Sequence, residues 1–163
     1  TLQQISNSRL VINAISSEMP GEQLSSEARY RRTTEYLYAL GELLEGRSVS
    51  LDGEFLQLHI DPPRISGLGL GCPPVYFGGL SEAARDCAAA SADVYLMWPD
   101  TTAKVSSVIF DLRLRAQQLP QRGGLSVGRR VVCLCGRGRV RTARFKKTIH
   151  RVRALRRVFA QKA

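Results

Sequence analysis

Short apolar runs alternate with amphipathic helical patterns along the first 135 residues, and this alternation limits the possible folds more than any other feature. The runs typical of strands cover residues 10–16, 73–78, 92–98 and 128–135. The helical patterns cover residues 27–45, 81–91 and 102–119. In these, apolar residues recur at steps of three and four. The order predicts right-handed βαβ units, a parallel sheet and an α/β fold.

The number of strands predicts only part of a closed barrel. A barrel of eight parallel strands and eight helices needs about 250 residues, whereas this chain has 163 residues and four such strands. Between the first two strands, residues 49–58 alternate around Asp52-Gly53, which predicts an inserted β-hairpin. Prolines and glycines in 59–72 predict a loop. We expect about half a (β/α)8 barrel with a hairpin insertion.

The joint between the second strand and its helix is the main candidate binding site. Gly78 and Gly79 follow the apolar run Val75-Tyr76-Phe77, and Ser81 stands where a helix N-cap would lie. A glycine turn that leads into a helix presents free backbone N–H groups, which favour a phosphate. The alternative is a structural joint, because strand-Gly-Gly-helix connections also occur without a ligand.

Two polar residues end the first strand. Asn13 and Ser16 lie at or after the apolar run Leu10-Val11-Ile12, which is typical of a strand buried on both faces. In a barrel of parallel strands, polar side chains at the carboxyl ends face the active site. Asn13 and Ser16 are therefore site candidates, although Asn13 would equally serve to fix a neighbouring loop.

Charge divides the chain in two. Residues 1–111 carry all 14 acidic residues and 8 basic ones, a net charge of −6, whereas residues 112–163 carry 16 basic residues and no acidic one. We interpret 1–120 as a barrel domain and 121–163 as a basic tail. Two interpretations of the tail stay open: an out-of-frame translation of a GC-rich gene, or a basic arm with a helix over 142–160 that binds nucleic acid or an anionic surface.

No feature of the sequence predicts secretion, a membrane span or a metal site. An apolar run of about 18 residues and a signal segment are both lacking, so a cytoplasmic protein is expected. Four cysteines and two histidines show no spacing typical of zinc ligands. His59, near the end of a hairpin strand, is expected at the surface.

Five blocks together resemble one known family. These are residues 10–17, Ala28-Arg29-Tyr30, the Asp52-Gly53 hairpin, residues 73–84 and residues 92–98. In order and spacing they resemble the luciferase-like flavin-dependent monooxygenases, and most closely the alkanesulfonate monooxygenase branch. The resemblance covers about residues 1–120. It implies a TIM barrel that binds reduced FMN from a separate flavin reductase and uses O2 to cleave a C–S bond, releasing sulfite and an aldehyde.

The resemblance also implies roles for single residues. It places Asn13 and Ser16 near the flavin ring and Tyr30 near the flavin phosphate. Gly78, Gly79 and Ser81 match the phosphate-binding turn, and Arg130 matches an active-site arginine, which makes Arg130 the one candidate catalytic residue.

The chain departs from the family pattern at residues close to these positions. Leu80 replaces the first serine of the family's Gly-Gly-Ser-Ser, and Val132 replaces its active-site histidine. Valine neither donates nor accepts a proton.

These departures predict a truncated, inactive fragment of an enzyme that acts on a small sulfonate-like substrate. Open sheet edges further predict association, in the form of a homo-oligomer. A non-catalytic, basic-tailed binding protein is the alternative function, and nucleic acid is the less favoured partner because a basic tail alone reads no sequence.

Overall fold

A five-stranded sheet forms the centre of the computed structural model, which describes residues 2–16, 20–63, 71–119, 130–134 and 140–143, the last two ranges as backbone only. Its strand order is β1-β4-β5-β6-β7. The strands β1 (Ile12–Ala14), β4 (Val75–Gly78), β5 (Val94–Met97) and β6 (Arg130–Leu134) run parallel to one another. The predicted α/β fold with four parallel strands, part of a luciferase-like barrel, is confirmed.

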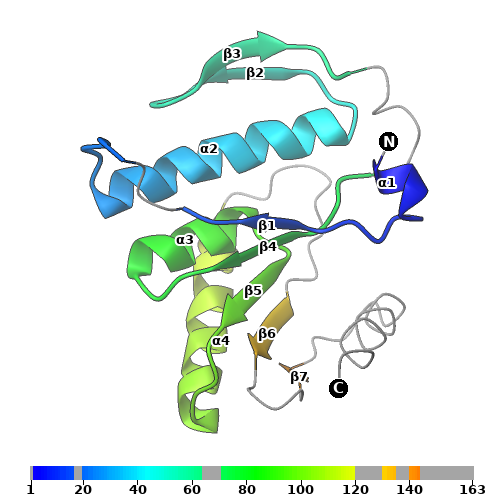
Figure 1. Cartoon of the computed structure of the whole chain (residues 1–163). Helices are drawn as coiled ribbons and strands as arrows, with labels where there is room; N and C mark the ends of the chain where they lie inside the picture. Colours follow the sequence, from blue (N-terminus) through cyan, green and yellow to red (C-terminus); the bar gives the residue numbers. More distant parts are fainter. Residues whose placement is uncertain (1, 17–19, 64–70, 120–129, 135–139, 144–163) are drawn as a thin grey trace.

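Three long helices follow strands, as predicted, and each begins at a hydroxyl side chain. They are α2 (Ser26–Leu44), α3 (Glu82–Ser91) and α4 (Thr102–Gln118). The N-cap residues Ser25, Ser81 and Thr101 each accept a hydrogen bond from the N–H three residues further on. The helix α3 contacts both α2 and α4, and the short helix α1 (Leu2–Ile5) lies at the start of the chain (Figure 1).

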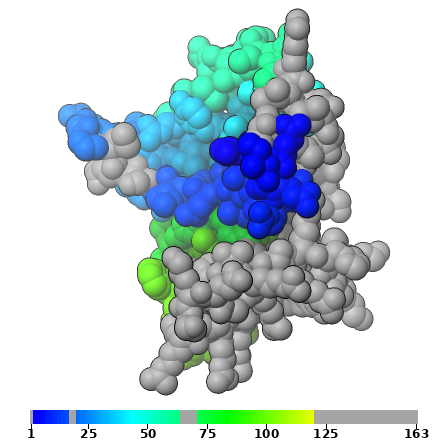
Figure 2. All heavy atoms as spheres, turned by 45° about the vertical axis from the view of Figure 1, so that its right-hand side comes forward, coloured from blue at the N-terminus to red at the C-terminus, as the bar shows by residue number. Residues whose placement is uncertain are grey.

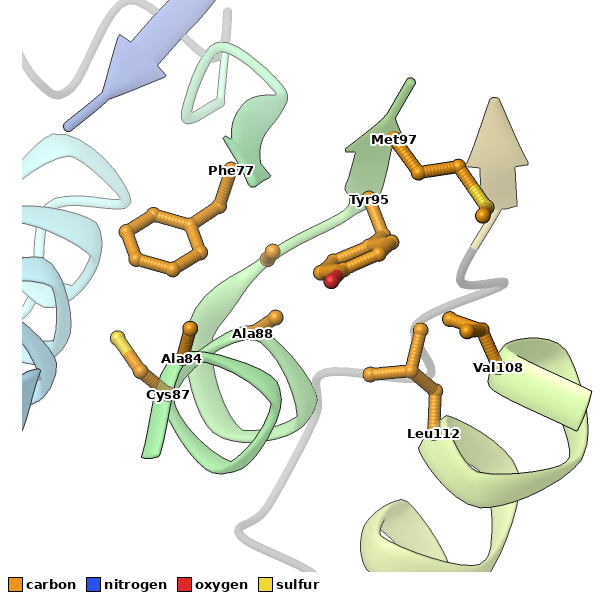
Figure 3. Packing of buried hydrophobic residues seen from close by; sticks show 9 residues of the cluster. Phe77, Ala84, Cys87, Ala88, Tyr95, Met97, Val108 and Leu112 are labelled. Atoms are coloured by element: carbon orange, nitrogen blue, oxygen red, sulfur yellow. The ribbon is translucent and has the colours of Figure 1, made fainter. Parts of the chain in front are cut away.

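The core lies between the sheet and the helices α3 and α4 (Figure 3). Phe77, Tyr95 and Met97 point from β4 and β5 toward alanines of α3 and toward Val108 and Leu112 of α4. The small alanine side chains let α3 approach the sheet closely, so that Phe77 is fully buried. The predicted apolar face of α4 is confirmed, because Val105 and Ile109 also pack against this cluster.

The first strand differs from the prediction. A strand buried on both faces was expected over 10–16, but β1 spans only Ile12–Ala14, and Asn13 is exposed. Ala14 packs toward the core, so Asn13 faces the opposite side of the sheet. The segment from α1 to β1, dark blue in Figure 2, lies at the surface of the described part of the molecule. The reason is that β1 has one strand neighbour, β4, among the described residues.

The predicted hairpin is present, but its turn is longer than expected. The strands β2 (Val49–Asp52) and β3 (Gln57–Ile60) are antiparallel, and Asp52 pairs with Gln57. Asp52-Gly53 is therefore not a two-residue turn, because residues 53–56 form the loop. The hairpin lies on the side of α2 away from the main sheet (Figure 1). The exposed position of His59 agrees with the expectation for that residue.

Beyond α4 the structure describes two strands. The last of them, β7 (Val140–Ala143), pairs antiparallel to β6. The sequence predicted a parallel sheet, so this antiparallel strand was not expected. The possible helix over 142–160 does not start at Thr142, because Thr142 and Ala143 belong to β7. The rest of that segment, residues 144–160, lies outside the described residues, as do residues 121–129 of the tail.

The described helices include none that could span a membrane, since none is both long and apolar enough.

Candidate functional site

Close packing explains why both residues of the Gly78-Gly79 turn are glycines. A Cβ atom on Gly78 would lie 2.8 Å from the carbonyl oxygen of Leu96 in the neighbouring strand. A Cβ atom on Gly79 would lie 2.5 Å from the Cβ of Ala84 and 3.2 Å from the hydroxyl of Tyr30. Real Cβ atoms essentially never approach other atoms within 3.0 Å, so side chains here would push β4, β5 and α3 apart. The glycines therefore bring the turn close to the start of α3.

The start of α3 presents backbone N–H groups beside this turn. The hydroxyl of Ser81 accepts a hydrogen bond from the N–H of Ala84 at 3.1 Å, and its carbonyl accepts one from Arg85 at 3.1 Å. The N–H groups of Glu82 and Ala83 come before these, and the first turn of a helix offers them no partner within the helix. The turn and the helix start thus have the chemistry of an anion site.

Tyr30 of α2 is the third part of this arrangement. Its ring lies edge-on to Phe77, with the ring centroids 6.1 Å apart and the planes at 78°. This contact places the Tyr30 hydroxyl beside Gly79. The structure thus brings together four residues that the sequence nominated for phosphate binding: Tyr30, Gly78, Gly79 and Ser81.

Asn13 and Ser16 lie at the same edge of the sheet. Asn13 pairs in register with Tyr76, one strand spacing of about 4.8 Å away, and Ala14 pairs with Phe77. Ser16 follows the end of β1, as Gly79 follows the end of β4. The Oγ atom of Ser16 is buried and has no hydrogen-bond partner in the described part of the chain. A buried hydroxyl without a partner is costly, so Ser16 is suited to bind a polar group of a ligand.

Arg130 stands apart from these residues. It is the first residue of β6 and pairs in register with Val94, the first residue of β5. Its backbone therefore lies at the amino end of the parallel strands, whereas Gly78 ends β4 at the carboxyl end. The structure does not bring the backbone of Arg130 to the turn, and a catalytic role for Arg130 stays a prediction.

An open groove of about 650 Å³ lies between α2 and α3, but its charges do not suit a phosphate. Its lining includes the carboxylates of Glu27, Glu82 and Asp86. Backbone hydrogen bonding at the helix start and the Ser25 hydroxyl lower the pKa of Glu27, which keeps this group ionised. The cation in the lining is Arg31, which already pairs with Glu54 at 2.9 Å. The groove is also lined by Tyr30, Ser81, Glu82 and Ala83, so an anion at the start of α3 would have these carboxylates as neighbours.

Tyr95 makes a contact with this turn that the sequence did not reveal. Its hydroxyl donates a hydrogen bond to the carbonyl oxygen of Gly79. Burial raises the pKa of Tyr95, so the phenol keeps its proton and remains a donor at neutral pH. The sequence feature that could have indicated this contact is a tyrosine within the apolar run Val94-Tyr95-Leu96, because a buried tyrosine hydroxyl usually has a hydrogen-bond partner.

Exposed apolar side chains mark the same edge of the sheet. Ile15, Leu80 and Trp98 follow the ends of β1, β4 and β5, and each is at least 75% exposed. Leu80 lies inside the turn itself, where the resemblance implied a serine. The turn thus offers backbone N–H groups and one hydroxyl, that of Ser81, rather than two hydroxyls.

The residues fit the phosphate end of the flavin that the resemblance implies. Gly79 lets the turn pack against the start of α3, and the first turn of α3 supplies N–H groups. On the neighbouring strand, Ser16 has a buried hydroxyl without a partner in the described part of the chain, which suits a polar group of the flavin ring. The sequence as a whole agrees with this arrangement. The family model described as luciferase-like monooxygenase matches residues 1–155, so the chain belongs to the luciferase-like monooxygenase family.

Two curated relatives are named sulfoquinovose monooxygenase. The protein from Novosphingobium aromaticivorans is 52% identical over 108 residues, which are 66% of this chain and 30% of that relative. The protein from Agrobacterium fabrum is 39% identical over 104 residues, which are 62% of this chain and 27% of that relative. The chain thus spans less than a third of the length of the curated relatives that it matches.

Proposed function

We propose that this chain carries the flavin-phosphate part of a monooxygenase that uses reduced FMN and O2 to cleave the C–S bond of an organosulfonate. The observation that supports the proposal is the turn from Gly78 to Ser81. It presents helix N–H groups at the carboxyl edge of a parallel sheet, beside the hydroxyl of Tyr30. This edge is where ligands bind in parallel α/β proteins.

The proposed role of each residue follows from its contacts. The N–H groups of Glu82 and Ala83 would bind phosphate oxygens. The Ser81 oxygen accepts the helix N–H of Ala84, which leaves the hydroxyl proton of Ser81 free to donate to the phosphate. Asn13 and Ser16, one strand away, would contact the polar edge of the flavin ring.

The proposed reaction balances with one O2 for each flavin. When bound, reduced FMN supplies two electrons that activate O2 for attack on the sulfonate-bearing carbon. One oxygen atom stays on that carbon as an aldehyde and the other leaves as water, while the C–S bond breaks to release bisulfite. The names of the relatives favour a sulfonated sugar, sulfoquinovose, over a simple alkanesulfonate.

Three further features belong to the proposal. A separate flavin reductase would supply reduced FMN, and the protein would act in the cytoplasm. The edge of β1 that no described strand covers favours a homo-oligomer. Because Val132 replaces the histidine of the family pattern, the chain by itself is proposed to bind flavin without turning over substrate.

Flavin affinity and sulfite release test the proposal separately. The chain should bind FMN at least tenfold more tightly than riboflavin, which lacks the phosphate, when measured by quenching of flavin fluorescence. With a flavin reductase, NADH, O2 and sulfoquinovose, the chain should release no more sulfite than the reductase alone. Equal affinity for FMN and riboflavin would refute the phosphate site, and sulfite release above the control would refute the proposed inactivity.

A further inference from the structure

The carbonyl group of Gly79 is fixed from within the core. Tyr95 reaches it from β5, where Tyr95 pairs in register with Phe77 and is only 5% exposed. Its ring points from the sheet toward α3 and α4 among the core residues (Figure 3). The phenol therefore has little freedom, and its hydrogen bond to Gly79 holds the carbonyl toward the core.

The direction of this carbonyl determines the direction of the next N–H group. A trans peptide unit is planar, and its C=O and N–H bonds point in opposite directions. No described peptide bond is cis. With the Gly79 carbonyl held toward Tyr95, the N–H of Leu80 must point away from the core. Leu80 is itself 75% exposed, so the core does not cover this residue.

Two further contacts keep the turn in this orientation. The Cβ of Ala84 and the hydroxyl of Tyr30 lie so close to Gly79 that even one added methyl group would not fit. Rotation of the peptide between Gly79 and Leu80 would also leave the buried hydroxyl of Tyr95 without its acceptor, at the cost of a buried unsatisfied group. The turn is thus held in one orientation before any ligand arrives.

We infer that Tyr95 is a positioning residue for the phosphate site, which directs the N–H of Leu80 at the phosphate of the flavin. This inference rests on the proposed function, because it assigns a cause to the phosphate selectivity proposed there. It also explains how the turn tolerates leucine at position 80. The backbone N–H of that residue binds the anion, and its side chain is not required.

The variant Tyr95→Phe tests this role, because it removes one hydroxyl and keeps the ring in the core. We expect its affinity for FMN to fall about fivefold to tenfold, as for one lost hydrogen bond. Its affinity for riboflavin should stay within twofold of that of the unchanged chain. The matched control is Tyr38→Phe, which removes the hydroxyl of a half-buried tyrosine on α2 and should change neither affinity.

The comparison of the two flavins separates positioning from stability. A role of Tyr95 in stability alone would lower both affinities equally or change neither, and either result would overturn the inference. A failure of the proposed function appears instead in the unchanged chain, which would then bind FMN and riboflavin equally well; that result would overturn both.

A second measurement needs no variant. In the ¹⁵N-labelled chain, the amide resonance of Leu80 should be among those that FMN shifts most, and riboflavin should leave it in place. A Leu80 resonance that does not respond to FMN would overturn the inference even if Tyr95→Phe fails to fold.

Discussion

Asp93 and Val75 form two hydrogen bonds with each other. The carboxylate of Asp93 accepts a hydrogen bond from the N–H of Val75 at 2.8 Å, and the N–H of Asp93 donates to the carbonyl of Val75 at 2.9 Å. Val75 begins β4 and Asp93 directly precedes β5, so this pair fixes the relative position of the two strands. It lies at the amino end of the strands, opposite the Gly78-Gly79 turn, and therefore concerns stability rather than binding.

Removal of this carboxylate should destabilise the fold. Asp93→Ala leaves the N–H of Val75 without its acceptor at a buried residue, and we expect the free energy of unfolding to fall by about 1–3 kcal/mol. Urea denaturation followed by circular dichroism measures this change. The matched control is Asp52→Ala on the exposed hairpin, which should change stability by less than about 0.5 kcal/mol. Equal effects of the two variants would contradict the role assigned to Asp93.

Glu35 should hold the hairpin to α2. Its carboxylate accepts hydrogen bonds from the N–H groups of Glu54, Phe55 and Leu56, each at 2.9 Å. Glu35→Ala removes all three bonds while leaving the main core intact. We expect hydrogen exchange at the amides of Phe55 and Leu56 to become at least tenfold faster, with little change at Phe77.

The control for this prediction keeps Glu35 and removes a nearby ion pair. Glu54→Gln breaks the pair with Arg31, in which both side chains are more than half exposed, and such surface pairs contribute little. Exchange at Phe55 and Leu56 should therefore stay nearly unchanged. If Glu54→Gln speeds exchange as much as Glu35→Ala does, the ion pair rather than the Glu35 carboxylate holds the hairpin.

Local sequence patterns predicted the helices and strands of this fold well, but they could not predict contacts between distant elements. The three- and four-residue steps from Val105 to Leu112 revealed the buried face of α4, because helical periodicity is a property of neighbouring residues. The hairpin turn was wrong by two residues because its acceptor, Glu35, lies on another element. The burial of β1 was overestimated for a similar reason, since an apolar run does not show whether its strand has one neighbour or two.

The residues of the candidate site likewise include some that a local sequence pattern reveals and one that it does not. Ser81 was found because an N-cap is a local feature, and Gly79 because a strand-glycine-helix joint can be read from the sequence. Tyr95 was not assigned to the site, because its bond to Gly79 spans 16 residues and depends on how β5 pairs with β4. A search for tyrosines inside apolar strands would have identified Tyr95 as a residue that needs a hydrogen-bond partner, but it would not have identified Gly79 as that partner.

The thiol of Cys72 should react slowly with alkylating reagents. Burial, with smaller contributions from Asp93 and Glu45, raises the pKa of Cys72 from 9.0 to about 11. The thiolate is the reactive form, so at pH 8 the folded chain should react about a hundredfold more slowly at Cys72 than the chain unfolded in urea. Iodoacetamide labelling followed by peptide mass spectrometry measures this rate for each cysteine.

The same shift gives a pH dependence with a defined sign. The folded state holds the Cys72 proton more tightly than the unfolded state does, so its contribution to stability is complete below about pH 9 and is lost as pH rises through about 11. Cys72→Ser should therefore show a smaller loss of stability between pH 9 and pH 11. An unchanged slope would mean that another group controls alkaline unfolding.

Gly79→Ala should weaken both the fold and the binding of FMN. The added methyl group would lie 2.5 Å from the Cβ of Ala84, which is on α3 and cannot move without shifting the helix. We expect a loss of about 1–3 kcal/mol of stability, as for overpacked sites. Displacement of α3 also moves its N–H groups, so affinity for FMN should fall more than affinity for riboflavin.

Gly41→Ala makes the same chemical change, but we expect it to raise the stability of the fold rather than lower it. Gly41 lies within α2 and has nothing within 4 Å of an added Cβ, so alanine should stabilise the helix by about 0.5–1 kcal/mol. Thermal denaturation of both variants measures the two signs, and fluorescence titration with FMN and riboflavin measures the selectivity. If Gly79→Ala is as stable as Gly41→Ala and keeps its preference for FMN, the close contact of the turn with α3 is not what forms the phosphate site.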